Sequence, residues 1–299
     1  MPYPFAERAD SRRRLVWLAG AAVVIAAGIW VRALPAGSLR PAAAFGWTSA
    51  TTVNLYFVDG PFLFPASRRF QTNDRLPRAV LDALLAGPIH SGRLSSAVPR
   101  DVKVRGFSFA DGLARIDLSR ELGDADDGRR ALAAISETMI RVPGISSVAV
   151  SVHGEPLAAS ARRTPLLYFP SADGLIAVPS TATDARQALD AYLSGPPAPE
   201  MTGVPADVRL LTYDHDAADR LLSIGFTYTP ALRTLALEKP DRTRMLLLGL
   251  IASLTEFSDV QTVRLDFGGQ SRLGLGECSD LLRSPQGRPA LLNDERLID

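Results

Sequence analysis

Histidine is the first residue type to consider, because it binds metals and transfers protons near neutral pH. The chain has three, at positions His90, His153 and His215. No second histidine or cysteine follows any of them at metal-site spacing. His215 has the most suggestive neighbours, since Asp214, Asp216 and Asp219 flank it, but the segment lacks the twelve-residue pattern of a calcium loop. We interpret this segment as a solvated turn rather than a metal site.

A pair of aspartates, Asp111 and Asp117, has the composition of an acid/base pair. Asp111 precedes a glycine and is explained by a tight turn. Asp117 alternates with Ile116 and Leu118, so its side chain is expected on the opposite, solvated face, or in a capping role. The pattern therefore gives no reason to assign catalysis to either carboxylate.

The remaining motifs are weak. There is no nucleophile elbow, phosphate-binding loop or dinucleotide fingerprint. The glycines from Gly268 to Gly276 open no predicted helix, and the single cysteine, Cys278, has no disulfide partner in the chain. The arginine pairs Arg68-Arg69 and Arg129-Arg130 are typical of plain surface. We predict no catalytic, cofactor-binding or metal-binding residue and no cofactor.

Regular elements dominate the region that begins at Thr52. β-branched and aromatic runs predict strands, and apolar residues at helical spacing predict helices. The helix over 76–86 is expected to be capped by Asn73 or Asp74 and to end at Gly87-Pro88. The expected segments, in order, are 52–58, 63–71, 76–86, 102–110, 113–118, 128–142 and 147–152.

The dipeptide Asp111-Gly112 between two alternating runs predicts a two-residue hairpin turn with both residues at positive φ. In that register Phe107 lies opposite Ile116, and Phe109 lies opposite Ala114. We expect these four side chains to form a core face.

The same order of elements then begins again. Tyr168-Phe169 repeats Tyr56-Phe57, and three further segments repeat at similar distances along the chain. Those segments are Ala83–Pro88 with Ala191–Pro196, Val98–Val102 with Val204–Val208, and Val142–Val148 with Phe257–Val263. Echoes in a fixed order indicate an internal duplication, and the period of more than 100 residues is too long for a solenoid.

The second copy departs from the first in its turn, its helix and its tail. A polar loop, 214–219, stands in place of Asp111-Gly112. A helix over about 242–255 contains an apolar run that is too short to cross a membrane, so we expect deep packing. The tail over 272–299 is rich in Gly, Pro, Arg and Asp, and we expect it to lie over the surface or fray.

The N-terminal segment is apolar from Leu15 to Val31, with arginines at Arg12–Arg14 before it and Arg32 after it. Such a run predicts a membrane-spanning helix, and its basic flank places the N-terminus in the cytoplasm. A cleaved signal peptide, with Ala42–Ala44 as the processing site, is the alternative. A lipid anchor is disfavoured because no cysteine lies nearby.

Composition agrees with a folded extracytoplasmic region. The chain of 299 residues is 46% hydrophobic, which suits two domains with packed cores. The formal net charge of +1 gives no argument for nucleic-acid binding. We therefore expect a single-pass protein of the cell membrane whose C-terminal domains lie outside the cytoplasm.

The motifs of residues 52–154 resemble the GerMN domain of spore germination proteins. They are Tyr56-Phe57, Leu84–Pro88, Val98-Pro99, Asp111–Leu118, Thr138, Val148 and Gly154. Residues 165–269 resemble it more loosely. The resemblance implies an extracytoplasmic protein of sporulating bacteria, related to the ring-building domains of the channel between mother cell and forespore.

The expected architecture is α+β, with two tandem small domains that each have a mainly antiparallel sheet and two helices on one face. The expected segments are a cytoplasmic tail over 1–14, a transmembrane helix over 15–32, a linker over 33–51, domains over 52–156 and 164–270, and a tail over 271–299.

The expected function is non-catalytic assembly in the envelope during sporulation or germination. Expected partners are envelope or membrane proteins, including ring-forming sporulation proteins and a second copy of this chain. An envelope hydrolase, or a binder of cell-wall glycan unrelated to sporulation, is the alternative.

Overall fold

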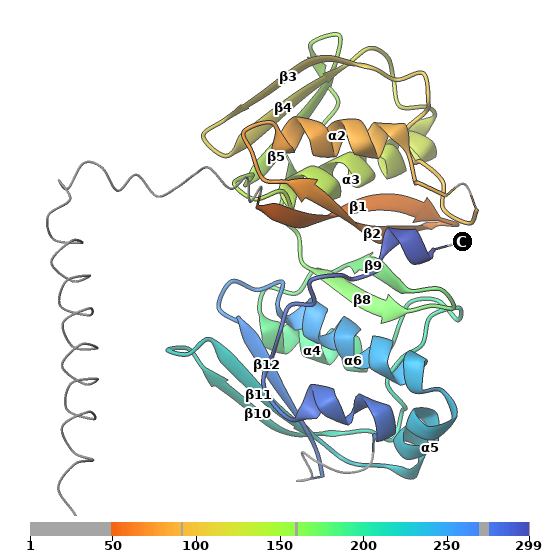
Figure 1. Ribbon diagram of the computed structural model, residues 1–299, viewed down its shortest axis with the longest axis vertical. Coiled ribbons are helices and arrows are strands. Elements are labelled where there is room, and N and C mark those ends of the chain that lie inside the picture. Colours follow the sequence, from red (N-terminus) through yellow and green to blue (C-terminus); the bar gives the residue numbers. More distant parts are fainter. Residues whose placement is uncertain (1–48, 91, 159–160, 269–274, 299) are drawn as a thin grey trace, which may run out of the picture. The chain divides into compact units, whose positions relative to one another are not determined.

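The computed structural model describes residues 49–90, 92–158, 161–268 and 275–298 (Figure 1). Residues 49–299 cluster as one compact unit. The predicted membrane helix over 15–32, the tail over 1–14 and nearly all of the linker over 33–51 lie outside the described residues. Within the described part, no helix is both long enough and apolar enough to cross a membrane.

The first repeat contains two helices and the strands that pack on them. Most boundaries agree with the sequence predictions, and the Leu76–Ala86 helix and the Ser147–Val152 strand have the predicted ends. The elements are β1 (Ala50–Asp59), β2 (Phe62–Gln71), α2 (Leu76–Ala86), β3 (Val104–Ala110), β4 (Leu113–Leu118), α3 (Ala125–Ile140), β5 (Ser147–Val152), β6 (Glu155–Pro156) and β7 (Ala161–Arg162).

The second repeat follows the same plan, with an additional helix, α5, that the sequence analysis missed. The elements are β8 (Leu166–Pro170), β9 (Leu175–Pro179), α4 (Ala185–Leu193), β10 (Leu210–Asp216), β11 (Leu221–Phe226), α5 (Pro230–Glu238), α6 (Pro240–Leu254) and β12 (Thr262–Phe267). A C-terminal segment then adds η1 (Gly276–Leu282), β13 (Gln286–Gly287) and η2 (Glu295–Leu297).

The strands of the described residues form three sheets, with orders β1-β2-β9-β8, β3-β4-β5-β6 and β10-β11-β12-β13, and β7 pairs with β5. The expectation of one mainly antiparallel sheet per domain is therefore wrong. Each repeat divides its strands between two sheets, and β4–β5 and β11–β12 pair in parallel. The helical crossover through α3 or α6 accounts for the parallel pairs, because parallel neighbours need such a connection.

The first sheet is shared by the two repeats. β2 pairs with β9 through Leu63 and Ala177. Figure 1 shows α2 and α3 between the β1–β2 hairpin and the β3–β4–β5 strands, and α4 and α6 in the same position of the second repeat. The strand orders of the two copies agree, which confirms the duplication.

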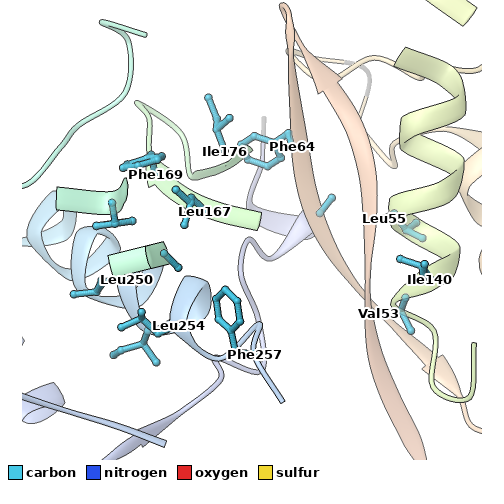
Figure 2. Packing of buried hydrophobic residues seen from close by; sticks show 14 of the residues in the cluster. Val53, Leu55, Phe64, Ile140, Leu167, Phe169, Ile176, Leu250, Leu254 and Phe257 are labelled. Carbon is cyan, nitrogen blue, oxygen red and sulfur yellow. The ribbon is translucent and has the colours of Figure 1, made fainter. Parts of the chain in front are cut away.

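The cores of the two repeats are built from equivalent positions. Figure 2 shows Val53 and Leu55 of β1 beside Ile140 of α3, and Leu167 and Phe169 of β8 beside Leu250 of α6. All are buried. Leu55 and Leu167 occupy matching places in the two strands, so the same packing supports each copy.

The Asp111-Gly112 turn is confirmed. Ala110 pairs with Leu113, and φ is 52° at Asp111 and 75° at Gly112. Phe107 lies opposite Ile116 and Phe109 opposite Ala114, as predicted. The core face is smaller than expected, however, because Phe109 is 41% exposed: β3 is the outer strand of its sheet.

Helix caps and turns differ from prediction in three places. Arg75 rather than Asn73 or Asp74 is the N-cap of α2, and its side chain makes no capping bond. α3 begins at Ala125 instead of Gly128, because the Asp124 carboxylate accepts hydrogen bonds from the main chain of Asp126 and Asp127. The polar loop expected over 214–219 starts later, since Asp214 to Asp216 belong to β10.

The C-terminal tail does not fray across its described residues. Leu275, Cys278, Leu281 and Leu282 are buried against the second repeat. Polar composition misled the prediction because the apolar residues of the tail are few but closely spaced. The end of the tail, in blue in Figure 1, lies beside β2 and β9.

Asn293 of that tail closes the junction between the repeats. Its Nδ2 donates to Pro65 O at 2.7 Å and to Leu175 O at 2.9 Å, and its Oδ1 accepts from Leu175 N at 2.8 Å. Glu295, 1% exposed, accepts from Arg68 Nε at 2.6 Å. The tail therefore joins β2 and β9 where the strands themselves scarcely pair.

Candidate functional site

Two of the three histidines singled out from the sequence, His153 and His215, contact neighbouring elements. His153 Nδ1 lies 2.6 Å from Arg105 Nη1, and His215 Nε2 lies 3.0 Å from the main-chain oxygen of Asp259. Among the described residues, no group of three or more His, Cys, Asp or Glu side chains is placed to hold a metal ion.

The aspartates singled out from the sequence hold turns. Asp117 Oδ1 accepts from Gly154 N at 2.8 Å and from Ser151 Oγ at 2.9 Å. These two hydrogen bonds lower the pKa of Asp117. Asp216 Oδ1 accepts from the main chain of Ala218 and Asp219. Each carboxylate therefore has a structural task.

The other candidates are dispersed. Arg129 and Arg130 form ion pairs with Asp126 and Asp127 on the surface of α3. Cys278 is buried and not in a disulfide, and burial raises the pKa of its thiol. Residues 269–274 of the glycine-rich stretch lie outside the described residues.

A buried polar network, which the sequence analysis missed, lies where the two repeats meet. Tyr56 Oη and Tyr168 Oη are 3.1 Å apart, and Tyr168 Oη donates to Glu256 Oε1 at 2.8 Å. Arg288 Nη2 lies 2.6 Å from the same Glu256 oxygen. The Glu256 side chain is 0% exposed, so its charge depends on these partners.

The second carboxylate oxygen of Glu256 is held by arginines from the first repeat and the connection. Arg141 Nη2 lies 3.1 Å and Arg163 Nη2 lies 3.2 Å from Glu256 Oε2. Arg141 also lies 2.9 Å from Glu137 Oε2 and stacks over the Tyr56 ring at 5.6 Å. Arg141 is 6% exposed, so this ion pair is a buried connection between the repeats.

The electrostatics follow from burial and charge. Burial alone would raise the pKa of Glu256, but Arg288, Arg141 and Arg163 outweigh it and the pKa is lowered. Burial raises the pKa of Glu137, which has only Arg141 close by as a strong compensating charge. Glu256 therefore stays ionised at neutral pH and acts as the anionic centre of the junction.

The junction is built from equivalent positions of the two repeats. Tyr56 N donates to Thr138 Oγ1, and Tyr168 N donates to Ser253 Oγ, both at 2.9 Å. These bonds satisfy outward N–H groups of β1 and β8, the end strands of the shared sheet. Three residues beyond Thr138 and Ser253 lie Arg141 and Glu256, so the central ion pair joins matching positions that carry opposite charges.

A sequence signal for this network existed. The echo of Val142–Val148 in Phe257–Val263 aligns Arg141 with Glu256, one residue before each segment. A charge reversal at matching positions of a duplicated chain is the pattern that an interface between copies produces.

The outer strands β3 and β10 are the second notable feature. Among the described residues, β3 pairs only with β4 and β10 only with β11. Both have a register shift, at Arg105 in β3 and at Leu211 in β10. Phe109 and Leu211 are exposed on them, at 41% and 57%. Equivalent strands with free edges can accept a strand from a partner.

Comparison with known proteins identifies a family. The model of the family Germane, described as "Sporulation and spore germination", matches residues 54–158 and 166–272. This confirms the resemblance that the sequence motifs indicated. No curated protein matches the chain.

One solved structure shows the same tandem fold. The tandem GerMN domains of the sporulation protein GerM from Bacillus subtilis align over 81% of this chain and 99% of theirs, with 15% identity and a TM-score of 0.62. The first GerMN domain of that protein aligns over 36% of this chain and 86% of its own, with 19% identity and a TM-score of 0.32. A putative lipoprotein from Clostridium perfringens covers 38% of this chain and 89% of its own, with 20% identity and a TM-score of 0.28.

Proposed function

Because the chain belongs to the Germane family of sporulation and spore germination proteins, we propose that it is a non-catalytic assembly protein of the cell envelope in that process. It recruits other envelope proteins to the outer face of the membrane. The proposed setting is the channel that joins mother cell and forespore.

The observation that carries this proposal is the pair of equivalent outer strands, β3 and β10. Each presents an unpaired edge and an exposed apolar side chain, Phe109 or Leu211, within the described part of the chain. The proposed occupant is an extended strand of a neighbouring envelope protein, paired through main-chain hydrogen bonds. The bulges at Arg105 and Leu211 interrupt the edge and so discourage unselective pairing.

Rigidity between the repeats supports a scaffold role. The buried Arg141–Glu256 pair and the Asn293 contacts hold the two outer strands in a fixed relation. Two binding strands in fixed positions increase avidity for a partner that engages both.

The N-terminal anchor is part of the proposal. The apolar run over 15–31 confines the domains to a plane, which raises their effective concentration toward membrane neighbours. Protease added to intact protoplasts is expected to digest the chain beyond about residue 40 and to spare the N-terminus. Digestion that requires lysis contradicts this orientation.

Charge on the outer strands tests the assembly role. In a strain that lacks the gene, the wild-type protein is expected to restore sporulation, whereas a Phe109→Lys, Leu211→Lys double variant is not, because lysine on an edge strand opposes pairing. The matched control is Leu237→Lys, which changes an exposed leucine of α5 that is 63% exposed. Melting temperature and membrane abundance are measured for every variant.

Full sporulation by the folded double variant overturns the role of the edges. Substitutions at Asp117, His153 or His215 that match the deletion, in a folded and abundant protein, favour the alternative of an envelope hydrolase or a cell-wall glycan binder.

A further inference from the structure

A groove of about 800 Å³ opens beside Glu256 on the second repeat. The connection before β8, the turn before β11, the turn after α6 and the C-terminal segment contribute to it. The residues used below are Arg163, Thr183, Arg220, Glu256, Gln261 and Arg288.

Positive charge dominates this groove. Arg163, Arg220 and Arg288 line it together with one carboxylate, that of Glu256, which leaves two positive charges in excess. Arg141 does not line the groove; it pairs with Glu256 and also has Glu137 at 2.9 Å, so including Arg141 and Glu137 in the count adds one charge of each sign and leaves the excess unchanged. The excess is therefore available to an anion that enters from solvent.

Glu256 positions the arginines without exhausting their donors. Arg163 uses Nε and Nη2 on Glu256, at 3.3 Å and 3.2 Å, and remains 48% exposed. Arg288 uses Nη2 on Glu256 and on Tyr168 Oη, and Nη1 on Ala252 O. Arg220 uses Nη2 on Ser258 O. A guanidinium has five N–H donors, so each side chain keeps donors for a ligand.

Arg220 adopts a backbone conformation that its residue type disfavours. Its φ is 52°, in the left-handed region that glycine enters freely and that a Cβ makes costly. Gly112 holds the equivalent place in the first repeat. Gly112 O accepts from Ser146 N and Ser147 N, and Arg220 O accepts from Gln261 N and Thr262 N. Strain of this kind concentrates at functional positions.

We propose that this groove binds a phosphate-bearing ligand through Arg163, Arg220 and Arg288. A phosphomonoester carries nearly two negative charges, which matches the two excess positive charges of the groove. A single carboxylate would neutralise only one of these charges. Guanidinium groups bind phosphate oxygens in bidentate geometry. Thr183 and Gln261 add polar groups, and the volume leaves room for a sugar or glycerol attached to the phosphate.

The groove marks a divergence between the copies. Glu256 replaces Arg141, Arg220 replaces Gly112, and Arg288 comes from the C-terminal segment that follows both repeats. The ligand site therefore lies at the second repeat, with Arg163 supplied by the connection before β8, and it does not include Leu211, the exposed side chain of the outer strand β10.

Calorimetry of the full chain in nonionic detergent, at fixed ionic strength, tests the proposal with inorganic phosphate as the probe. Arg220→Gly is expected to weaken binding at least about tenfold while the melting temperature stays level or rises. Asp111→Gly is the matched control, because Asp111 has the same φ of 52° but lies in the first repeat. It is expected to bind like the wild type.

Two further comparisons show whether the phosphate comes from a lipid or from a soluble molecule, and whether the groove prefers phosphate to carboxylate. Detergent micelles that contain phosphatidic acid, a phosphomonoester lipid, compared with phosphatidylcholine micelles, report a lipid headgroup, whereas free inorganic phosphate reports a soluble phosphate. Citrate reports recognition of carboxylates. The proposal is overturned if neither phosphate probe binds, if citrate binds as tightly, or if Arg220→Gly binds within about twofold of the wild type.

Discussion

The two repeats have the same strand order but differ at the positions where they meet. Arg141 follows α3 in the first repeat, and Glu256 follows α6 at the matching place in the second. Identical copies would oppose like charges at this contact, in a site with almost no solvent to screen them. The difference between the copies at this position therefore makes the contact attractive, where identical residues would repel.

Helix packing shows a second difference. Gly249 of α6 occupies the place of Ala134 in α3, and a Cβ built on Gly249 would lie 2.2 Å from Tyr168 O. The glycine lets α6 approach β8 more closely than an alanine would. The first repeat thus has alanine, which favours a helix more than glycine does. The second repeat has glycine, which lets α6 pack closer to β8.

The largest expected effect is at the charge reversal itself. Glu256→Gln should destabilise the protein by about 3–5 kcal/mol. The substitution removes the carboxylate that Arg141 faces in the second repeat, so the buried guanidinium loses the charge that compensates it there. The free energy of unfolding in urea measures this. Asp280→Asn is the control, since its pair with Arg244 is exposed and should cost less than about 1 kcal/mol. Equal losses in the two variants would show that the buried pair is not special.

The pH dependence of stability provides a second test of the contribution of the Glu256 charge. The folded pKa of Glu256 is lowered from 4.5, so its stabilisation is present above that pH and is lost as the pH falls. Glu137 has a raised pKa and acts oppositely, since its charged form is penalised in the folded state. Stability measured from pH 6 to pH 3 should therefore fall less steeply in Glu256→Gln than in the wild type. Parallel curves would contradict this assignment.

The glycine difference predicts a smaller cost. Gly249→Ala should destabilise by about 1–3 kcal/mol, because the new methyl group meets a main-chain oxygen that cannot move freely. Ala134→Gly, the reverse change in the first repeat, should cost about 1 kcal/mol through helix propensity. Thermal unfolding compares them, and a harmless Gly249→Ala would show that α6 has room to shift.

Substitutions at the two turns should act in opposite directions, and the change at Arg220 should be the smallest of all. Gly112→Val should cost about 1–3 kcal/mol, since a β-branched residue fits positive φ poorly. A Cβ there would also lie 2.6 Å from Ser146 Oγ. Arg220→Gly should change stability by less than about 1 kcal/mol, in the favourable direction, because it removes the same strain from the second repeat. If Gly112→Val and Arg220→Gly changed the melting temperature in the same direction, the two turns would not be structurally equivalent.

Local patterns in the sequence predicted local structure well. The Asp111-Gly112 turn, its register and the Leu76–Ala86 helix follow from neighbours along the chain. The shared sheet does not, because Leu63 and Ala177 pair across more than 100 residues. β-branched composition indicates a strand but not its partner.

The junction network escaped prediction for a related reason. A lone arginine at 141 or glutamate at 256 is typical of surface, since charged residues are almost never buried without a partner. Only the fold brings Arg141 to Glu256 and Arg288. The echoes indicate the duplication, but they do not indicate which matching positions of the two copies meet in the fold.

Asn293 has a consequence for the order in which the protein matures. A ribosome adds this residue after every strand that it joins, so β2 and β9 wait for it while the rest of each repeat can already pack. During that interval Pro65 O and Leu175 O lack their final donor, and the shared sheet is held by its single pair at Leu63 and Ala177. Completion of the joint is therefore a late, C-terminal event, which follows the contacts that Tyr56, Tyr168 and the Arg141–Glu256 pair can already make across the repeats.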